Sequence, residues 1–164
     1  MSKQKPRRVR WAPTNNTLTI AAHNVSKPLP TDIDDVMRTM RTAARSFCEG
    51  HGSNDHWAVL AGHVDMALSI ERQGVVRGLS EFWQLADEVV RALYSRANVK
   101  GEWVSPTLYA DEINALNQFL DLHHYQIQQL SRSEYSAAIK SAHGRIRGQG
   151  YRVGVECDFE EVAA

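Results

Sequence analysis

The chain has 164 residues, of which 43% are hydrophobic and 23% charged, and its 19 basic residues balance its 19 acidic residues. This size and composition are typical of one globular domain with its own core, and the neutral net charge disfavours both a general nucleic-acid coat and an acidic DNA mimic. Two cysteines, no apolar signal segment and no membrane-length apolar run predict a soluble cytoplasmic protein with reduced thiols.

Residues 1–30 are predicted to form a basic N-terminal arm. Two prolines near its end disfavour a helix, so residues 17–25 are expected to be extended at best. Bases suit phosphate groups, and an indole suits a nucleobase or a protein pocket. The arm is therefore a candidate contact for a partner, with a purely solubilising terminus as the alternative. The residues concerned are Lys5, Arg7, Arg8, Arg10 and Trp11.

Residues 31–150 are predicted to form a helical bundle, because apolar residues recur there at spacings of three and four. Ser53 is the expected N-cap of the second helix, and Gly50 and Gly74 are the expected stops of the first and second. The third helix is expected to start at Val75 or Ser80. The first, second and fourth helices are expected to span residues 32–49, 54–73 and 107–130, and the third is expected to end at residue 96.

A fifth helix is predicted from the capping-box pair Ser131 and Glu134 to about Gly148. It carries Arg145 and Arg147, which would extend a basic surface if the fold brought them near the arm. Residues 151–164 are expected to be a short C-terminal segment that starts with strand-forming residues and ends in an acidic tail. Because strands and helices do not alternate, the fold class is predicted as an all-α bundle of four or five helices.

The tryptophans divide into two groups by their surroundings. Trp57 and Trp83 lie in strongly apolar helical stripes and are predicted to be in the core. Trp103 lies in a loop-like segment, residues 98–106, where either a partner or a packed corner would hold it. Aromatic and arginine side chains are the usual anchors of protein interfaces, so Trp103 joins the arm as a candidate partner-binding residue.

The histidines are predicted to be structural. His123 occupies an apolar seam position and is expected inside the bundle, whereas His124 is expected to be solvated. Asp121 and His124 would be half of a carboxylate–histidine metal site, but the second copy that such a site needs is missing.

A zinc site is the other arrangement that the histidines suggest. It would combine Cys48 and His51 with His56 and His63, but a loop from Gly50 to Ser53 interrupts that set. No metal and no cofactor are therefore predicted, and Cys48 is expected to be buried as a small apolar side chain.

No catalytic signature stands out. The sequence has no phosphate-binding glycine loop, no nucleophile elbow and no His-Glu-x-x-His motif. The acid pairs Asp34-Asp35, Asp87-Glu88 and Asp111-Glu112 fall in first turns or on polar faces, where carboxylates that are solvated or complement the helix dipole are expected rather than a general acid and base. The protein is therefore expected not to be an enzyme.

Three stretches, "WAPTNNTL", "WAVLAGHVDMALSIERQGVVRG" and "SPTLYADEINALNQFLDLHHYQIQQLSRSEY", resemble small uncharacterised proteins encoded by bacteriophages and related mobile elements of proteobacteria. The resemblance implies an accessory protein of the bacterial cytoplasm that binds another protein, as inhibitors of host enzymes or anti-CRISPR proteins do. A nucleic-acid-binding regulator using the arm and a metal-dependent helical-bundle enzyme are the alternatives. The seam along residues 113–130 is compatible with a monomer or a homodimer.

Overall fold

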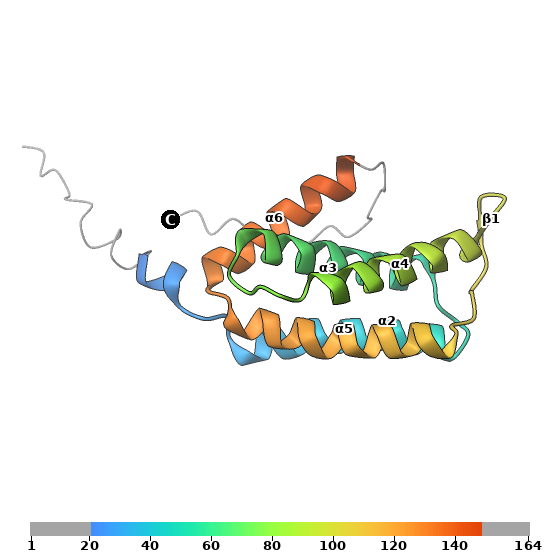
Figure 1. The fold of residues 1–164 in the computed structure, drawn as a ribbon, viewed down its shortest axis with the longest axis horizontal. Coiled ribbons are helices and arrows are strands. Elements are labelled where there is room, and N and C mark those ends of the chain that lie inside the picture. Colours follow the sequence, from blue (N-terminus) through green and yellow to red (C-terminus); the bar gives the residue numbers. More distant parts are fainter. Residues whose placement is uncertain (1–20, 149–164) are drawn as a thin grey trace, which may run out of the picture.

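The computed structural model describes residues 21–148, with side chains for residues 21–143. The fold is mainly all-α, as the apolar spacing predicts, with one small antiparallel hairpin (Figure 1). The predicted basic segment up to residue 20 and the predicted extended segment at residues 151–164 lie outside the described residues. The elements are α2 (Pro30–Cys48), α3 (Asn54–Gln73), α4 (Ser80–Ala97), β1 (Asn98–Val99), β2 (Glu102–Trp103), α5 (Ala110–Gln129) and α6 (Arg132–Gly148).

The helices pack in two layers (Figure 1). Helices α2 and α5 lie side by side in one layer and run in opposite directions, and α3 and α4 form the other layer. Helix α6 packs against α3 on the outer side of that second layer. The hairpin lies at one end of the bundle, where α4 finishes and the chain crosses to α5 (Figure 1).

Local signals in the sequence set most helix ends. Helix α2 starts at Pro30, whose missing N–H is no loss in the first turn of a helix. The Ser53 side chain accepts the N–H of His56, and the His56 Nδ1 accepts the N–H of Ser53, which makes a reciprocal cap. Gly74 ends α3 at φ 78°, a left-handed conformation that glycine adopts without strain. The predicted cap and stop of this helix are both confirmed.

The predicted capping box at the start of α6 is also confirmed. The Ser131 N–H donates to Glu134 Oε2 at 2.7 Å, and the Glu134 N–H donates back to Ser131 Oγ at 3.3 Å. The hydrogen bonds from the Ser131 backbone and hydroxyl lower the pKa of the Glu134 carboxyl below its ordinary value. The sharp turn between α5 and α6 is thus closed by its own side chains.

The segment before α2 differs from the prediction, because residues 21–25 are helical rather than extended. Proline constrains its own backbone and that of the residue before it, so Pro28, which follows the helical residues, leaves them free to form a helical turn. Two contacts then hold the segment in place. The Arg132 N–H donates to the Ser26 carbonyl at 2.9 Å, and Lys27 Nζ donates to the Gln128 carbonyl at 3.0 Å.

Helix α5 begins three residues later than predicted. The Tyr109 N–H donates to the Glu112 carboxylate at 2.9 Å, which makes Tyr109 the last residue before the helix. The loop expected over residues 98–106 contains the hairpin instead. Lys100 and Gly101 form its two-residue turn with φ values of 54° and 86°, the conformation that matches the twist of antiparallel strands.

The core lies between the two layers and is built from large apolar side chains. Trp57 and Trp83 belong to it, as predicted, and the Trp83 Nε1 donates to the Glu71 carboxylate at 2.8 Å. Cys48 was predicted to be buried, but it is exposed, because it lies at the last turn of α2 on the side away from the core. Among residues 21–148, no helix has both the length and the apolar character needed to cross a membrane.

Candidate interaction surface

The structure describes only one of the predicted partner-binding side chains. Five of them, Lys5, Arg7, Arg8, Arg10 and Trp11, lie outside the described residues, and the side chains of Arg145 and Arg147 on α6 do so as well. Trp103 is described, on β2. It is half-buried, so we next ask what it contacts.

Trp103 fixes the hairpin to the bundle. Its Nε1–H donates to the Gly52 carbonyl in the α2–α3 loop at 2.7 Å, and its ring lies 6.2 Å from that of Tyr94. Tyr94 in turn lies 4.6 Å from Trp57, whose Nε1–H donates to the Val90 carbonyl. Of the two roles that the sequence left open, Trp103 fills the packed corner in this structure.

The opposite face of the hairpin is exposed and apolar. Asn98 pairs with Trp103 and Val99 pairs with Glu102, and the Val104 N–H donates to the Ala97 carbonyl at 2.8 Å. Successive side chains of a strand point to opposite faces, so Val99 and Val104 lie on the face away from the Trp103 ring. Their exposed fractions are 49% and 55%.

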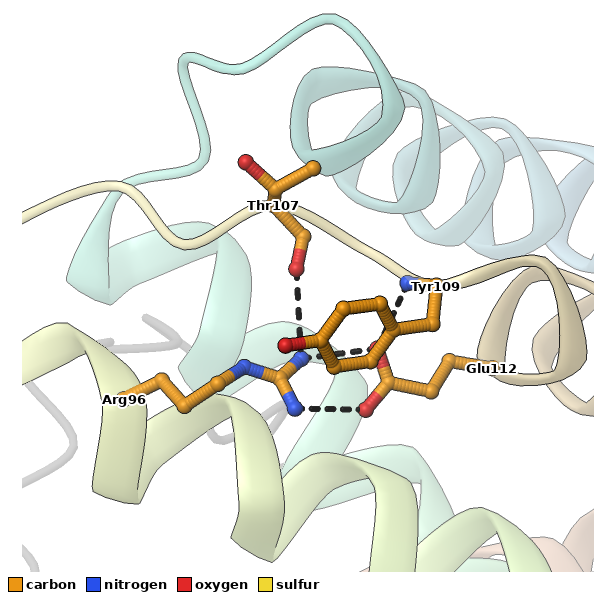
Figure 2. A network of polar contacts seen from close by, with 4 residues as sticks. All are labelled: Arg96, Thr107, Tyr109 and Glu112. Carbon is orange, nitrogen blue, oxygen red and sulfur yellow. Dashed lines mark hydrogen bonds and ion pairs between the residues drawn. The ribbon is translucent and has the colours of Figure 1, made fainter.

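Tyr109, the residue before α5, is a further exposed side chain at this end of the bundle. Its ring is 60% exposed, and the Arg96 guanidinium lies under it at 4.8 Å from the ring centre (Figure 2). This cation–π contact favours the observed position of the ring by about 0.5–1 kcal/mol. We call these residues the hairpin surface: Val99, Lys100, Glu102, Val104 and Tyr109.

An ion pair between Arg96 and Glu112 lies against Tyr109 (Figure 2). Both terminal nitrogens of Arg96 donate to the Glu112 carboxylate at 2.7 Å, and Arg96 Nη2 also donates to the Thr107 carbonyl at 3.3 Å. Two parallel charge-assisted hydrogen bonds of this kind are short, strong and directional. They join the end of α4 to the start of α5 on either side of the hairpin.

Of the two roles expected for Glu112, the solvated one is wrong, because its side chain is buried and paired, whereas its place in the first turn of α5 fits the dipole-complementing one. Burial raises the pKa of the Glu112 carboxyl. The hydrogen bonds from Arg96 and from the Tyr109 N–H lower it by more than burial raises it, so the pKa lies below its ordinary value. The same ion pair raises the pKa of Arg96. Sequence spacing showed an acid in the first turn of a helix but not the base that reaches it from α4.

Two histidines meet inside the bundle. His123 is fully buried, as predicted, and its Nε2 lies 3.4 Å from Nδ1 of His63 on α3. The Nδ1 of His123 lies 2.9 Å from Gln126 Oε1, and Gln126 Nε2 donates to the Ala67 carbonyl at 3.1 Å. This chain of contacts crosses from α5 to α3 through the core.

Burial depresses the basicity of both rings. Desolvation lowers the pKa of His63 to about 4. Desolvation, together with the nearby His63, lowers the pKa of His123 to about 3, against a weaker opposing effect of the Gln126 hydrogen bond. Both rings are therefore neutral near pH 7, as interior hydrogen-bonding groups. His124 on the next position is only partly buried and contacts the Gln128 side chain.

Metal ligation finds no support in the described part of the chain. No group of three or more histidine, cysteine, aspartate or glutamate side chains lies close enough there to hold a metal ion. The predicted alternatives around Asp121 and around Cys48 are not assembled among these residues.

Sequence reasoning missed the exposed valine face and the Arg96 contact. A signal for the first was present, because "VKGEW" places β-branched and aromatic residues around a turn dipeptide with glycine second.

Comparisons with protein-family models, with characterised proteins and with solved structures found no match to this chain.

Proposed function

We propose that the protein is a phage or mobile-element accessory protein that acts without catalysis, by binding another protein through the hairpin surface. An inhibitor of a host enzyme or of a defence system, such as an anti-CRISPR protein, would act in this way. The observation that carries the proposal is the pair of exposed valines and the exposed tyrosine, held on a rigid support at one end of the bundle.

The support matters because binding loses less conformational entropy when the contact residues are already ordered. Trp103 anchors the hairpin on one face, and the Arg96–Glu112 ion pair orders the start of α5 beneath Tyr109. Aromatic side chains ringed by polar groups are common at the energetic centres of protein interfaces. Lys100 and Glu102 at the tip supply such a polar rim.

The nucleic-acid alternative depends on the basic arm alone. Of the chain's 19 bases six lie outside residues 21–148, whereas only four of its 19 acids do, so the described bundle carries more acids than bases. An excess of acids disfavours contact with phosphate groups. A nucleic-acid complex made by the arm would weaken steeply with added salt in a gel-shift assay, because binding releases counterions.

The experiment is affinity capture from a bacterial lysate with matched variants. The wild type should retain one dominant protein. Replacing both exposed valines, Val99→Lys with Val104→Lys, should abolish that capture, whereas Leu85→Lys should not, although Leu85 on α4 is also 45% exposed. Far-ultraviolet circular dichroism should show the same helicity in all three proteins.

Two outcomes would contradict the proposal. Equal capture by the valine variant would reject the hairpin surface as the contact. Loss of capture only after alanine replacement of Arg7, Arg8, Arg10 and Trp11 would place the contact on the arm instead.

A further inference from the structure

The hydrogen bonds around His123 define where each proton lies. The Ala67 carbonyl can only accept, so the Gln126 atom that faces it must be the amide nitrogen. The Gln126 oxygen therefore faces His123, and the His123 Nδ1 must carry the hydrogen. A neutral imidazole has one N–H and one lone pair, so the His123 Nε2 is an acceptor.

The same logic extends to the second ring. The His123 Nε2 lies 3.4 Å from the His63 Nδ1, which must then donate, although the contact is long. The lone pair of His63 is therefore on its Nε2. The His63 side chain is only partly buried. The three hydrogen bonds thus all donate in one direction, from His63 through His123 and Gln126 to the backbone of α3. We call this chain of hydrogen bonds the relay.

Aromatic rings surround the His123 end of the relay. The ring of Phe119 stacks on His123 at 5.4 Å, and the uncharged ring of Trp83 on α4 lies edge-on at 6.2 Å. The titratable neighbours that act on His123 are His63 from α3 and His124 from α5. No carboxylate is among the groups that shift the pKa of either ring. An imidazolium formed here would be a buried cation without a partner.

We propose that the relay is a proton-sensitive latch between α3 and α5, in which His63 takes the first proton on Nε2 and His123 takes the second. The first proton leaves every hydrogen bond of the relay intact, because Nε2 of His63 is outside it. The second proton adds a hydrogen to the His123 Nε2, which then faces the His63 N–H as a second donor. That step removes the hydrogen bond that joins His63 to α5 and places two cations side by side, while the Gln126–Ala67 hydrogen bond still joins the two helices.

The direction of the pH effect follows from the sign of the shifts. The native pKa values, about 4 for His63 and about 3 for His123, lie below the ordinary value of 6.5. At a pH between the native values and 6.5, the unfolded chain binds protons that the native chain does not. The free energy of unfolding is therefore highest above pH 6.5 and falls as the pH drops.

The first test is the hydrogen position, read from the ¹⁵N shifts of the ring nitrogens at pH 7.5. We expect the hydrogen on Nδ1 in both His63 and His123, which is the less common tautomer of a free imidazole. A hydrogen on Nε2 of His123 would reverse the relay and overturn the proposal. This measurement needs no variant and is independent of any partner.

The second test is urea unfolding between pH 7 and pH 5 of the wild type, His63→Gln and His124→Gln. A glutamine amide at position 63 can still donate to the His123 Nε2 but does not titrate. The acid-induced rise in the unfolding constant should be about 20-fold smaller in His63→Gln than in the wild type. In His124→Gln the rise should match that of the wild type.

A rise in His63→Gln as large as in the wild type would show that the relay takes up no proton on unfolding, and would overturn the proposal. Because His63 is partly exposed and His63→Gln keeps the donor, this variant is expected to fold.

Discussion

The Arg96–Glu112 ion pair offers a quantitative test of how the hairpin surface is supported. Replacing Arg96 by methionine keeps most of its apolar stem but leaves the Glu112 carboxylate with only the Tyr109 N–H as a partner. Removing one partner of a fully buried pair costs about 3–5 kcal/mol. The Arg96 side chain is 29% exposed, so water recovers part of that cost, and we expect a loss of about 2–3 kcal/mol.

The reverse change should cost less. Glu112→Gln removes the charge but keeps an oxygen that accepts the Tyr109 N–H, so we expect a loss of about 1–2 kcal/mol. Because the two side chains contact each other, the double variant should lose less than the two single losses together. The pair stabilises the fold only while the Glu112 carboxylate is charged. The coupling should therefore weaken as the pH falls below 4.5, the ordinary pKa of Glu112, and vanish below its lowered native pKa.

The assay is urea denaturation followed by far-ultraviolet circular dichroism, with a second ion pair as control. Arg91 and Asp87 form an exposed pair one turn apart on α4, at 2.8 Å. Exposed pairs of this kind contribute about 0.3–0.5 kcal/mol, so Arg91→Met should be nearly neutral. If Arg96→Met costs no more than Arg91→Met, the reasoning from burial is refuted.

Three further changes test the packing. Gly52→Ala should destabilise the fold by about 1–3 kcal/mol, because its Cβ would overlap the buried Phe47 ring, and a melting curve unchanged from the wild type would contradict this. Glu71→Gln should cost about 1–2 kcal/mol, because the Glu71 carboxylate accepts hydrogen bonds from the N–H groups of Gly78 and Leu79 and from the Trp83 indole. Faster amide hydrogen exchange at Gly78 would show that the loss is in this loop. Ser131→Ala should cost about 1 kcal/mol through the lost cap, which Thr at that position should largely restore.

Much of the fold follows from local signals. Apolar spacing placed the first four predicted helices, because a buried helix face repeats every three or four residues whatever it packs against, and a capping box placed the fifth. The Ser53 cap, the Gly74 stop and the Ser131–Glu134 box are local as well, since each is made by residues within three positions of a helix end. The interior position of His123 followed from its apolar neighbours one turn away.

The candidate site was less accessible to sequence reasoning, because it depends on contacts between distant segments. The Glu112 carboxylate is buried only because Arg96 reaches it from another helix, and Trp103 is half-buried only because the Gly52 carbonyl accepts its N–H. Short strands such as Asn98–Val99 give too few residues for an alternating pattern to show.

The sequence by itself therefore determined the helices, their caps and the apolar faces that form the core. Only the tertiary structure decided which polar groups are paired, which valines stay exposed at the hairpin, and that His63 meets His123. The physical reason is that helix formation depends on interactions over three or four residues, whereas burial and pairing depend on which helices share a face.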